Sequence, residues 1–289
     1  MDERNITPSP AGSRPTLGVV AISYNEEEDL PGFLDHLLRF VDEIVIVDDG
    51  STDATPSIAE AAGDKVRFVS SPRADGEYFS HQRNKGIDAA RSDWLLHMDI
   101  DERVPPALAQ EISAAIADPA RDAYRLRRIN YFMHRPMNGG GWPDWCQVHL
   151  ARRQVLRFAG MFHEDCLVDT QRERIGTLAT RILHFNENSF TKRLRKSDRY
   201  LEEVCAEVRR RRPRFAGRAI AGAFLREFLK RYIIKRGFRD GTPGLIAALH
   251  SATAQFRAHA LVWDERNGRT RAELEAEVER LWRTSNSDA

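Results

Sequence analysis

The sequence predicts an α/β protein in which a mostly parallel sheet is flanked by helices and followed by a C-terminal helical extension. Short apolar runs of strand length alternate with segments of helical spacing over residues 17–98. This alternation is typical of a parallel sheet with right-handed crossovers. In addition, two of the expected strands end in acidic clusters. Open α/β sheets bind ligands at the carboxyl ends of their strands, so a ligand site is predicted at that edge.

The first two strands are each followed by a segment with helical signals. Residues 17–23 are almost all apolar, as in a strand buried on both faces. The acidic residues after it suit the first turn of a helix, and residues 30–38 repeat apolar side chains at helical spacing. Residues 43–47 form the second apolar run, and Gly50 allows a tight turn after it. The residues expected to cap the next helix, which runs to about residue 62, are Ser51, Thr52 or Asp53.

Two further strands, 66–69 and 94–98, complete the predicted parallel part, with a helix between them that Ser80 could cap. The last strand leads into Asp99-Ile100-Asp101, which directs two carboxylates toward one edge of the sheet. Hard divalent cations prefer oxygen ligands, and a diphosphate needs such a cation to neutralise it. Asp48-Asp49 ends the second strand at the same edge. Each cluster alone is typical of a solvated turn, but together they predict a metal–nucleotide site.

Four short motifs then occur in an order and spacing that identify a family. The motifs are Ser23-Tyr24-Asn25-Glu26-Glu27, Val47-Asp48-Asp49-Gly50-Ser51-Thr52-Asp53, Gln82-Arg83-Asn84-Lys85-Gly86 and His97-Met98-Asp99-Ile100-Asp101-Glu102. With them, the chain resembles family 2 glycosyltransferases, whose fold is the nucleotide-diphospho-sugar transferase fold of the GT-A type. The later segments 160–165 and 230–241 are similar to the branch that includes lipopolysaccharide core glycosyltransferases. The resemblance covers residues 16–190 and is looser beyond them.

The resemblance implies a binding site for a nucleotide sugar. Asp49 or Asp48 would accept a hydrogen bond from the base, and Arg83 would bind phosphate. Asp99 would face ribose or sugar hydroxyls, and Asp101 would ligate the cation. The residues expected to bind the nucleotide sugar are Ser23, Tyr24, Asn25, Glu26, Asp48, Asp49, Arg83, Asn84 and Asp99.

The resemblance also implies the chemistry. Glu164 and Asp165 match the acidic pair in which the family has its general base, and we prefer Asp165. The base takes the proton of the acceptor hydroxyl as that oxygen attacks the anomeric carbon from the opposite face, which inverts the configuration. The implied cofactor is Mg²⁺ or Mn²⁺, which stabilises the leaving diphosphate. Its expected ligands are Asp101, Asp99 and His184, although His184 is equally explained as a half-buried strand histidine with a backbone partner.

Composition and length indicate how the chain is organised. We expect a loose N-terminal tail over residues 1–15, a catalytic domain over 16–190 and a basic amphipathic helical extension over 191–289. At 42% hydrophobic residues, the 289-residue chain can bury a sizeable core. We expect neither a signal peptide nor a membrane span. The three widely spaced cysteines argue against a disulfide framework and for a reducing cytoplasm; they are Cys146, Cys166 and Cys205.

The net charge of +1 conceals an asymmetry. Residues 191–240 contain 17 lysines and arginines against 6 acidic residues, a net charge of +11, so the other segments together carry −10. Apolar residues recur at helical spacing within this basic segment, and a basic amphipathic helix can lie on an anionic leaflet. We therefore expect a peripheral protein at the inner face of the cell membrane. The alternative is a helix that packs on the catalytic domain with its basic face in water.

These observations predict a metal-dependent, inverting glycosyltransferase. Its donor would be a nucleotide-diphospho-sugar and its acceptor a glycan or lipid-linked molecule, in cell-envelope polysaccharide or lipopolysaccharide core synthesis. A sugar nucleotidyltransferase is one alternative, but it needs a glycine-rich basic loop after the first strand, where residues 24–28 are acidic or polar. A nucleic-acid-binding protein that uses the arginines of 209–214 is another. No recognition motif accompanies that charge, and the acidic edge would repel a polyanion, so no nucleic-acid partner is expected.

Overall fold

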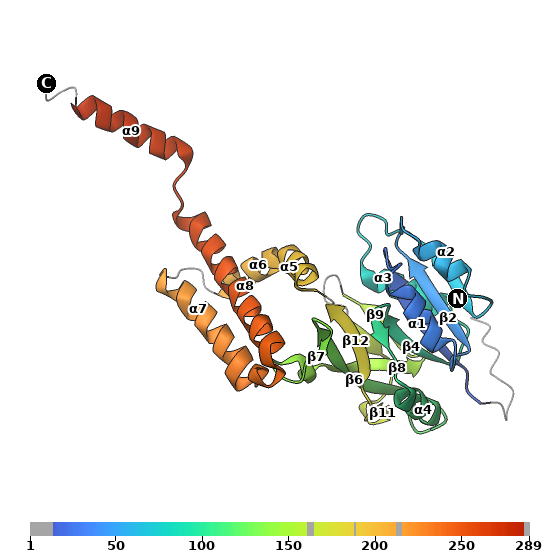
Figure 1. The fold of residues 1–289 in the computed structure, drawn as a ribbon. Helices are drawn as coiled ribbons and strands as arrows, with labels where there is room; N and C mark the ends of the chain where they lie inside the picture. Colours follow the sequence, from blue (N-terminus) through green and yellow to red (C-terminus); the bar gives the residue numbers. More distant parts are fainter. Residues whose placement is uncertain (1–13, 161–164, 188, 212–215, 286–289) are drawn as a thin grey trace. The chain divides into compact units, whose positions relative to one another are not determined.

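The computed structural model describes residues 14–160, 165–187, 189–211 and 216–285 (Figure 1). The chain divides into two compact units. One consists of Met1–Met137 and Trp142–Asn188, and the other of Asn138–Gly141 and Ser189–Ala289. Most of the tail expected over residues 1–15 lies outside the described residues. A large sheet forms the centre of the first unit, and helices make up most of the second.

The sheet of the first unit has the strand order β3-β2-β1-β4-β8-β6-β12-β5, with β7 and β11 paired to β6. β1 to β4 pair in parallel, as predicted, whereas β8 runs antiparallel to both β4 and β6. The α/β class is confirmed, and the sheet becomes mixed beyond β4. β9 and β10 form a separate antiparallel pair. The strands are β1 (Leu17–Ser23), β2 (Glu43–Asp48), β3 (Val66–Ser70), β4 (Trp94–Asp99), β5 (Glu102–Arg103), β6 (Ala123–Phe132), β7 (Arg135–Pro136), β8 (Cys146–Arg152), β9 (Leu156–Ala159), β10 (Asp165–Val168), β11 (Ile175–Thr177) and β12 (Ile182–Glu187).

Helices cover both faces of this sheet. Val19 and Ala21 of β1 belong to one apolar cluster with residues of α1, α2 and α4, whereas Val20 belongs to another with Ile87 of α3. Because both faces of β1, β2 and β4 are buried, their sequences are almost continuously apolar. The helices of this unit are α1 (Leu30–Leu37), α2 (Thr55–Glu60), α3 (Phe79–Ala89) and α4 (Pro106–Ala115), with 3-10 turns η1 (Trp142–Asp144) and η2 (Arg172–Arg174).

The prediction that Ser80 caps the helix before β4 is wrong. Helix α3 starts at Phe79, and its cap residue is Tyr78. The hydroxyl of Ser80 instead donates to the carbonyl of Gly160, just after β9, at 2.9 Å. This side chain therefore helps to hold the β9 end against α3.

A charged cluster at the start of β6 ties distant segments together. The Asp122 carboxylate accepts hydrogen bonds from Arg174, from Arg152 Nε at 3.1 Å and from Thr170 Oγ1 at 2.6 Å. Its hydrogen bonds to the Arg174 guanidinium hold the pKa of Asp122 well below the usual range. Charge-assisted bonds of this kind are stronger than neutral ones, so the cluster is expected to stabilise the edge formed by β6 and β11.

The second unit is a helical assembly around α8. α8 packs against α6 and α7, and Cys205, Val208, Ala258 and Val262 form its small core. Among the described helices, none combines the length and apolarity that crossing a bilayer requires. The elements are α5 (Phe190–Arg199), α6 (Leu201–Arg211), α7 (Arg218–Leu229), the π-helical turn η3 (Lys230–Ile234), the 3-10 turn η4 (Gly237–Asp240), α8 (Gly241–Asn267) and α9 (Arg271–Ser285).

Residues 138–141 belong to the second unit because they bind its η4 turn. The carboxylate of Asp240 accepts hydrogen bonds from the backbone N–H groups of Asn138 and Gly139, both at 2.8 Å. The same turn packs closely on the first turn of α8. A Cβ atom on Gly244 would lie 2.0 Å from the carbonyl oxygen of Gly237, so no larger residue fits there.

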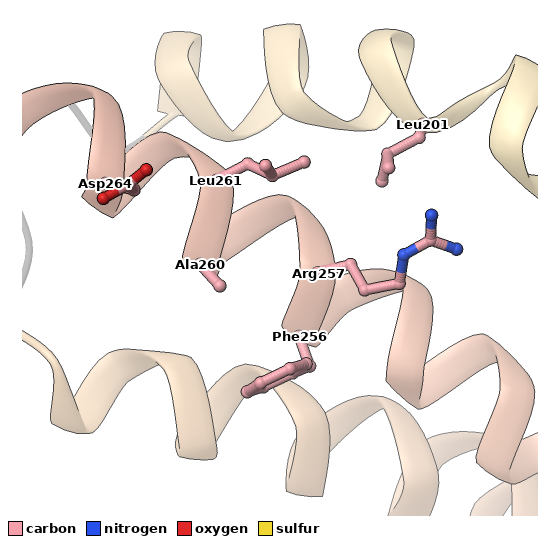
Figure 2. A pocket seen from close by; sticks show the side chains of 6 residues that line it. All are labelled: Leu201, Phe256, Arg257, Ala260, Leu261 and Asp264. Carbon is pink, nitrogen blue, oxygen red and sulfur yellow. The ribbon is translucent and has the colours of Figure 1, made fainter. Parts of the chain in front are cut away.

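A pocket of about 470 Å³ opens beside α8. Figure 2 shows its lining side chains, which come from α8 apart from Leu201 of α6. None of these residues is among those predicted to bind the nucleotide sugar or the metal. The lining residues are Leu201, Phe256, Arg257, Ala260, Leu261 and Asp264.

Candidate functional site

The carboxyl end of β2 is organised around Asp48. This residue is 1% exposed, and its carboxylate accepts four hydrogen bonds. The donors are the Ser23 hydroxyl at 2.7 Å, the Ser51 hydroxyl at 2.5 Å, and the backbone N–H groups of Gly50 and Ser51 at 3.0 and 2.8 Å. Asp48 and Ser23 therefore shape the turn, and the carboxylate of Asp48 has little capacity left for a ligand.

The ends of β1 and β2 are tied together by Asn25. Its backbone has a positive φ of 54°, a conformation that Asn adopts more readily than most residues. Its N–H donates to Ser51 Oγ at 2.8 Å, and its side-chain oxygen accepts from the N–H of Thr52 at 2.8 Å. The N–H of Glu26 donates to Thr55 Oγ1 at 2.7 Å. Tyr24, which precedes Asn25, is 56% exposed, so a ligand can reach it directly.

Asp49 stands apart from Asp48 in its contacts. Its carboxylate oxygens accept from the backbone N–H and from Nε of Arg73, each at 2.7 Å. The Arg73 guanidinium also lies over the Phe79 ring, 4.1 Å from its centroid. Asp49 is half-buried at the sheet edge, and the side chain of its partner Arg73 is partly exposed.

Arg83 and Asn84 are neighbours on α3 but form hydrogen bonds with different partners. Arg83 Nη2 donates to Asp99 Oδ1 at 2.8 Å. Partial burial opposes ionisation of Asp99, but the adjacent Arg83 outweighs it and lowers the pKa of Asp99 well below its usual range. Both polar groups of the Asn84 amide are bonded to the backbone of Phe158 in β9, each at 2.9 Å. Arg83 thus faces the acidic edge, whereas Asn84 fastens β9 to α3.

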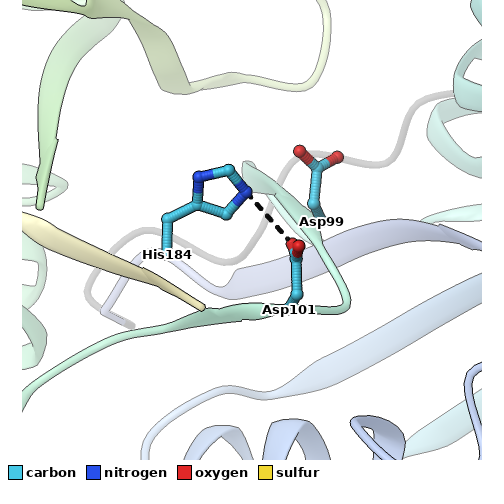
Figure 3. A group of neighbouring side chains, drawn as sticks. All are labelled: Asp99, Asp101 and His184. Atoms are coloured by element: carbon cyan, nitrogen blue, oxygen red, sulfur yellow. Dashed lines mark ion pairs between the residues drawn. The ribbon is translucent and has the colours of Figure 1, made fainter. Parts of the chain in front are cut away.

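Asp99, Asp101 and His184 converge on one point (Figure 3). Each offers a ligand atom, and these atoms all lie within 4.8 Å of one another. Asp99 ends β4 and Asp101 follows in the turn before β5, while His184 comes from β12, which pairs with β5 so that His184 lies opposite Glu102. His184 Nε2 lies 3.3 Å from Asp101 Oδ1. Two carboxylates and an imidazole suit a divalent cation such as Mg²⁺ or Mn²⁺, so the donor set fits the expected cofactor.

The orientation of the His184 ring is set by Asn130 of β6. Asn130 Nδ2 donates to the carbonyl of Trp142 at 3.1 Å, which turns Oδ1 toward His184 Nδ1 at 2.7 Å. An amide oxygen accepts only, so this contact assigns the ring proton to Nδ1. The lone pair of Nε2 then faces the two carboxylates, an arrangement that a cation between them would stabilise. Outer partners of this type orient metal-binding histidines in proteins.

Arg128, two residues before Asn130 on the same face of β6, opposes this arrangement. Its Nη1 lies 3.0 Å from His184 Nδ1 and can only donate, so it favours the other tautomer. The shorter contact and the fixed amide of Asn130 favour protonated Nδ1. Arg128 has other partners as well, since its guanidinium lies 3.5 Å from the centroid of the Trp145 ring and Nη1 lies 3.6 Å from Glu102 Oε1.

Glu102 lies next to the cluster of Asp99, Asp101 and His184 and is fully buried. Its Oε2 accepts from the backbone N–H of Asp99 at 3.1 Å, and His149 Nε2 lies 3.5 Å from its Oε1. Burial, followed by the negative charge of Asp99, raises the pKa of Glu102 to about 7. Burial, followed by the charge of Arg128, lowers the pKa of His149 to about 3, so this ring is neutral. Sequence reasoning assigned no role to Glu102, Arg128 or Asn130; only the two-residue spacing of the last two on one strand face is visible in the sequence.

Of the residues preferred as general base, Glu164 lies outside the described residues, and only the backbone of Asp165 is described. Asp165 begins β10 and pairs with Ala159 of β9. Because Asn84 and Ser80 fasten the β9 end to α3, the backbone of Asp165 belongs to a hairpin that is docked on the helix carrying Arg83. The structure thus brings Arg83, Asp99, Asp101 and His184 together, whereas Asp48 and Asn84 bind neighbouring parts of the chain.

Comparisons with known proteins place these residues in context. The family model described as glycosyl transferase family 2 matches residues 18–163. An uncharacterized glycosyltransferase from Rickettsia typhi, RT0209, is 24% identical over 252 residues, which cover 81% of this chain and 82% of the relative. The lipopolysaccharide core biosynthesis glycosyltransferase LpsC from Rhizobium meliloti is 26% identical over 258 residues, covering 86% and 92%.

Two solved structures match this chain at lower sequence identity. S. aureus TarS 1-349 in complex with UDP-GlcNAc matches with a TM-score of 0.45 and 17% identity, over 89% of this chain and 93% of that chain. Glucosyl-3-phosphoglycerate synthase from Mycobacterium tuberculosis with Mn²⁺, UDP-glucose and phosphoglyceric acid matches with a TM-score of 0.44 and 18% identity, over 64% and 79%.

Proposed function

Because the chain belongs to glycosyl transferase family 2, we propose that it is an inverting, metal-dependent enzyme that transfers a sugar from a nucleotide-diphosphate donor to a glycan or lipid-linked acceptor. One observation supports this most strongly. Asp99, Asp101 and His184 converge within 4.8 Å at the carboxyl edge of the parallel strands, next to the cationic side chain of Arg83. Two carboxylates, one imidazole and an arginine are the groups that a metal-bound diphosphate requires.

In the proposed donor site, Asp49 binds the base and Asp48 shapes the turn. Asp49 has an exchangeable partner in Arg73, whereas all four contacts of Asp48 are internal. Exposed Tyr24 and the adjoining loop, which Asn25 and Glu26 anchor, complete the nucleoside pocket. Arg83 would exchange its bond with Asp99 for the diphosphate, leaving Asp99 for ribose or sugar hydroxyls and the metal.

The proposed metal ligands are Asp101, Asp99 and His184, and a bound Mg²⁺ or Mn²⁺ would supply charge neutralisation for the departing diphosphate. Two further residues of the protein would hold these metal ligands in position. Asn130 keeps His184 Nε2 directed at the carboxylates, and Glu102 holds the Asp99 backbone. Groups that are held in place in this way need little reorganisation when charge develops in the transition state.

The transfer itself is proposed as a single displacement. The acceptor oxygen forms a bond to the anomeric carbon while the bond from that carbon to the diphosphate oxygen breaks. Asp165 or Glu164 takes the proton of the acceptor hydroxyl, and the nucleoside diphosphate leaves with the electron pair. Orienting the hydroxyl and excluding water allow a carboxylate of modest pKa to act as the base.

The relative LpsC is named a lipopolysaccharide core biosynthesis glycosyltransferase, which supports an acceptor of that class for this chain. Core and other envelope glycans are built on lipid carriers or lipid anchors, so we place the enzyme in the cytoplasm at the inner face of the cell membrane. The basic helical segment beyond residue 191 supports this location through its net charge of +11 between residues 191 and 240.

Calorimetric titration with UDP, GDP and ADP, each with Mn²⁺ and with a chelator, tests the donor site. We expect one nucleotide to bind tightly and only with the metal present. Asp101→Ala should abolish both metal-dependent binding and transfer while the circular dichroism spectrum is retained. Asp64→Ala, which removes an exposed carboxylate between α2 and β3, is the matched control. Full transfer activity of Asp101→Ala would refute the proposed role of the cluster.

A further inference from the structure

The outer face of α7 carries a row of large apolar side chains exposed to solvent. Leu225, Leu229 and Ile233 follow one another at intervals of four residues, so they lie on one stripe of α7 and its continuation η3. Their exposed fractions are 54%, 43% and 51%, and that of the adjacent Ile234 is 73%. The opposite side of α7 packs on α8, with Ala223 buried. We call Leu225, Leu229, Ile233 and Ile234 the α7 apolar row.

The segment that carries this row is rich in basic residues. Between residues 216 and 240 there are seven lysines and arginines and two acidic residues, a net charge of +5. Both acidic side chains are already engaged: Glu227 binds Arg231 at 2.7 Å and lies 3.5 Å from Lys230, and Asp240 accepts from two backbone N–H groups. The basic residues are Arg218, Arg226, Lys230, Arg231, Lys235, Arg236 and Arg239.

We propose that the α7 apolar row is a docking surface for an anionic lipid membrane, into whose headgroup region its aliphatic side chains insert. Burial of aliphatic side chains in the headgroup region removes apolar surface from water, and basic residues near an anionic surface are attracted to it. Long basic side chains at the edge of an apolar stripe can keep their charges at the headgroups while their stems lie along the apolar surface. The negative charge of Glu227 is offset by its contacts with Arg231 and Lys230, and the segment as a whole stays positive.

The charge of this segment favours a membrane over a second copy of the chain as the partner of the α7 apolar row. If this face paired with itself, two segments of net charge +5 would meet, and like charges across an interface oppose association. An anionic leaflet complements both the apolar row and the basic residues of its segment. The proposal deepens the membrane location proposed above by naming the surface and the lipid chemistry, but it does not depend on the identity of the donor or on the bound metal.

Vesicle flotation of the full chain tests the proposal. We expect binding to phosphatidylcholine vesicles that contain phosphatidylglycerol, and at least about tenfold weaker binding to phosphatidylcholine alone or at high salt. The variant Leu229→Ser/Ile233→Ser should bind anionic vesicles at least about tenfold less tightly. Arg226→Gln/Lys230→Gln should weaken binding and reduce its salt dependence. The matched control is Val278→Ser/Leu281→Ser on α9, whose side chains are 49% and 63% exposed and should not contribute.

Two outcomes would refute the proposal that the α7 apolar row binds membranes. One is equal vesicle binding by wild type and the Leu229→Ser/Ile233→Ser variant, with unchanged circular dichroism spectra. The other is self-association of the wild type, measured by light scattering without lipid, that this variant abolishes. Nucleotide binding is measured separately in the absence of vesicles, so failure of the docking surface can be told apart from failure of the proposed donor site.

Discussion

The substitution Asn130→Leu tests whether the tautomer of His184 controls metal binding. Leucine is similar in size to asparagine but cannot accept a hydrogen bond, so the 2.7 Å contact to His184 Nδ1 is lost. Arg128 Nη1, at 3.0 Å, then remains as the partner of that nitrogen and selects the tautomer whose proton is on Nε2. In that tautomer, Nε2 donates toward Asp101 instead of offering a lone pair to a cation.

The expected magnitude follows from these two contacts. Loss of the neutral bond from His184 Nδ1 to Asn130 removes about 0.5–1.5 kcal/mol from the metal-binding tautomer. Arg128, whose Nη1 also lies near Glu102, then favours the other tautomer without opposition. Because both side chains are nearly buried, solvent replaces little of this. Part of the Arg128 contribution already exists in the wild type, so we expect a loss of about 10- to 100-fold in Mn²⁺ affinity, the range typical of such outer partners.

Electron paramagnetic resonance titration of Mn²⁺ into the nucleotide-free protein measures this affinity without relying on activity. Proton–nitrogen correlation spectra of the histidine ring report the tautomer directly. Asn130→Asp keeps an acceptor toward His184 and should retain most of the affinity. Asn267→Leu removes another asparagine bond to a backbone carbonyl, at 2.8 Å in α8, and serves as the matched control. Wild-type Mn²⁺ affinity in a folded Asn130→Leu protein would refute the tautomer argument.

Three further predictions address the turn at β2, the second unit and acid stability. Asp48→Asn should lower the free energy of unfolding by about 1–3 kcal/mol, because an amide cannot accept four hydrogen bonds. Asp49→Asn should lower the free energy of unfolding by less than about 1 kcal/mol but weaken nucleotide binding in calorimetry. Gly244→Ala should destabilise the chain by about 1–3 kcal/mol in urea denaturation, because its Cβ would clash with the backbone. Gly222→Ala, with open space around its Cβ, should stabilise α7 by about 0.5–1 kcal/mol. Equal effects of the two variants on stability would contradict the close packing at Gly244. Because the pKa of Asp122 is lowered in the folded chain, its stabilisation is present above its unfolded pKa of about 3.9 and is lost as the pH falls through the folded pKa. Asp122→Asn should therefore be less stable at neutral pH and lose less stability on acidification; parallel urea midpoints from neutral pH to about pH 3 would contradict this.

Much of the first unit could be predicted because its signals are local. Continuous apolar runs indicate strands buried on both faces, and helical spacing between them indicates crossovers, so β1 to β4 followed from neighbouring residues alone. Asp99 and Asp101 were recognisable as candidate ligands for the same reason, since they lie within three residues of each other at the end of one strand. Helix starts were less predictable: α3 begins at Phe79 because Tyr78 and His81 bond there, while Ser80 binds the backbone after β9.

Local sequence patterns were enough to predict the strand–helix alternation, the acidic edge and the basic character of the segment after residue 191. Which of these residues act together depends on how the strands pair. His184 lies more than eighty residues from Asp101 in the chain and reaches it because β12 pairs with β5. Asn130 and Arg128 reach His184 because β12 also pairs with β6. Strand pairing of this kind depends on contacts between segments that are distant along the chain, and hydrophobic periodicity within a short window carries no information about it. The same is true of Asp48 and Asp49, which adjoin in sequence but differ in role because one side chain points into the turn and the other meets Arg73.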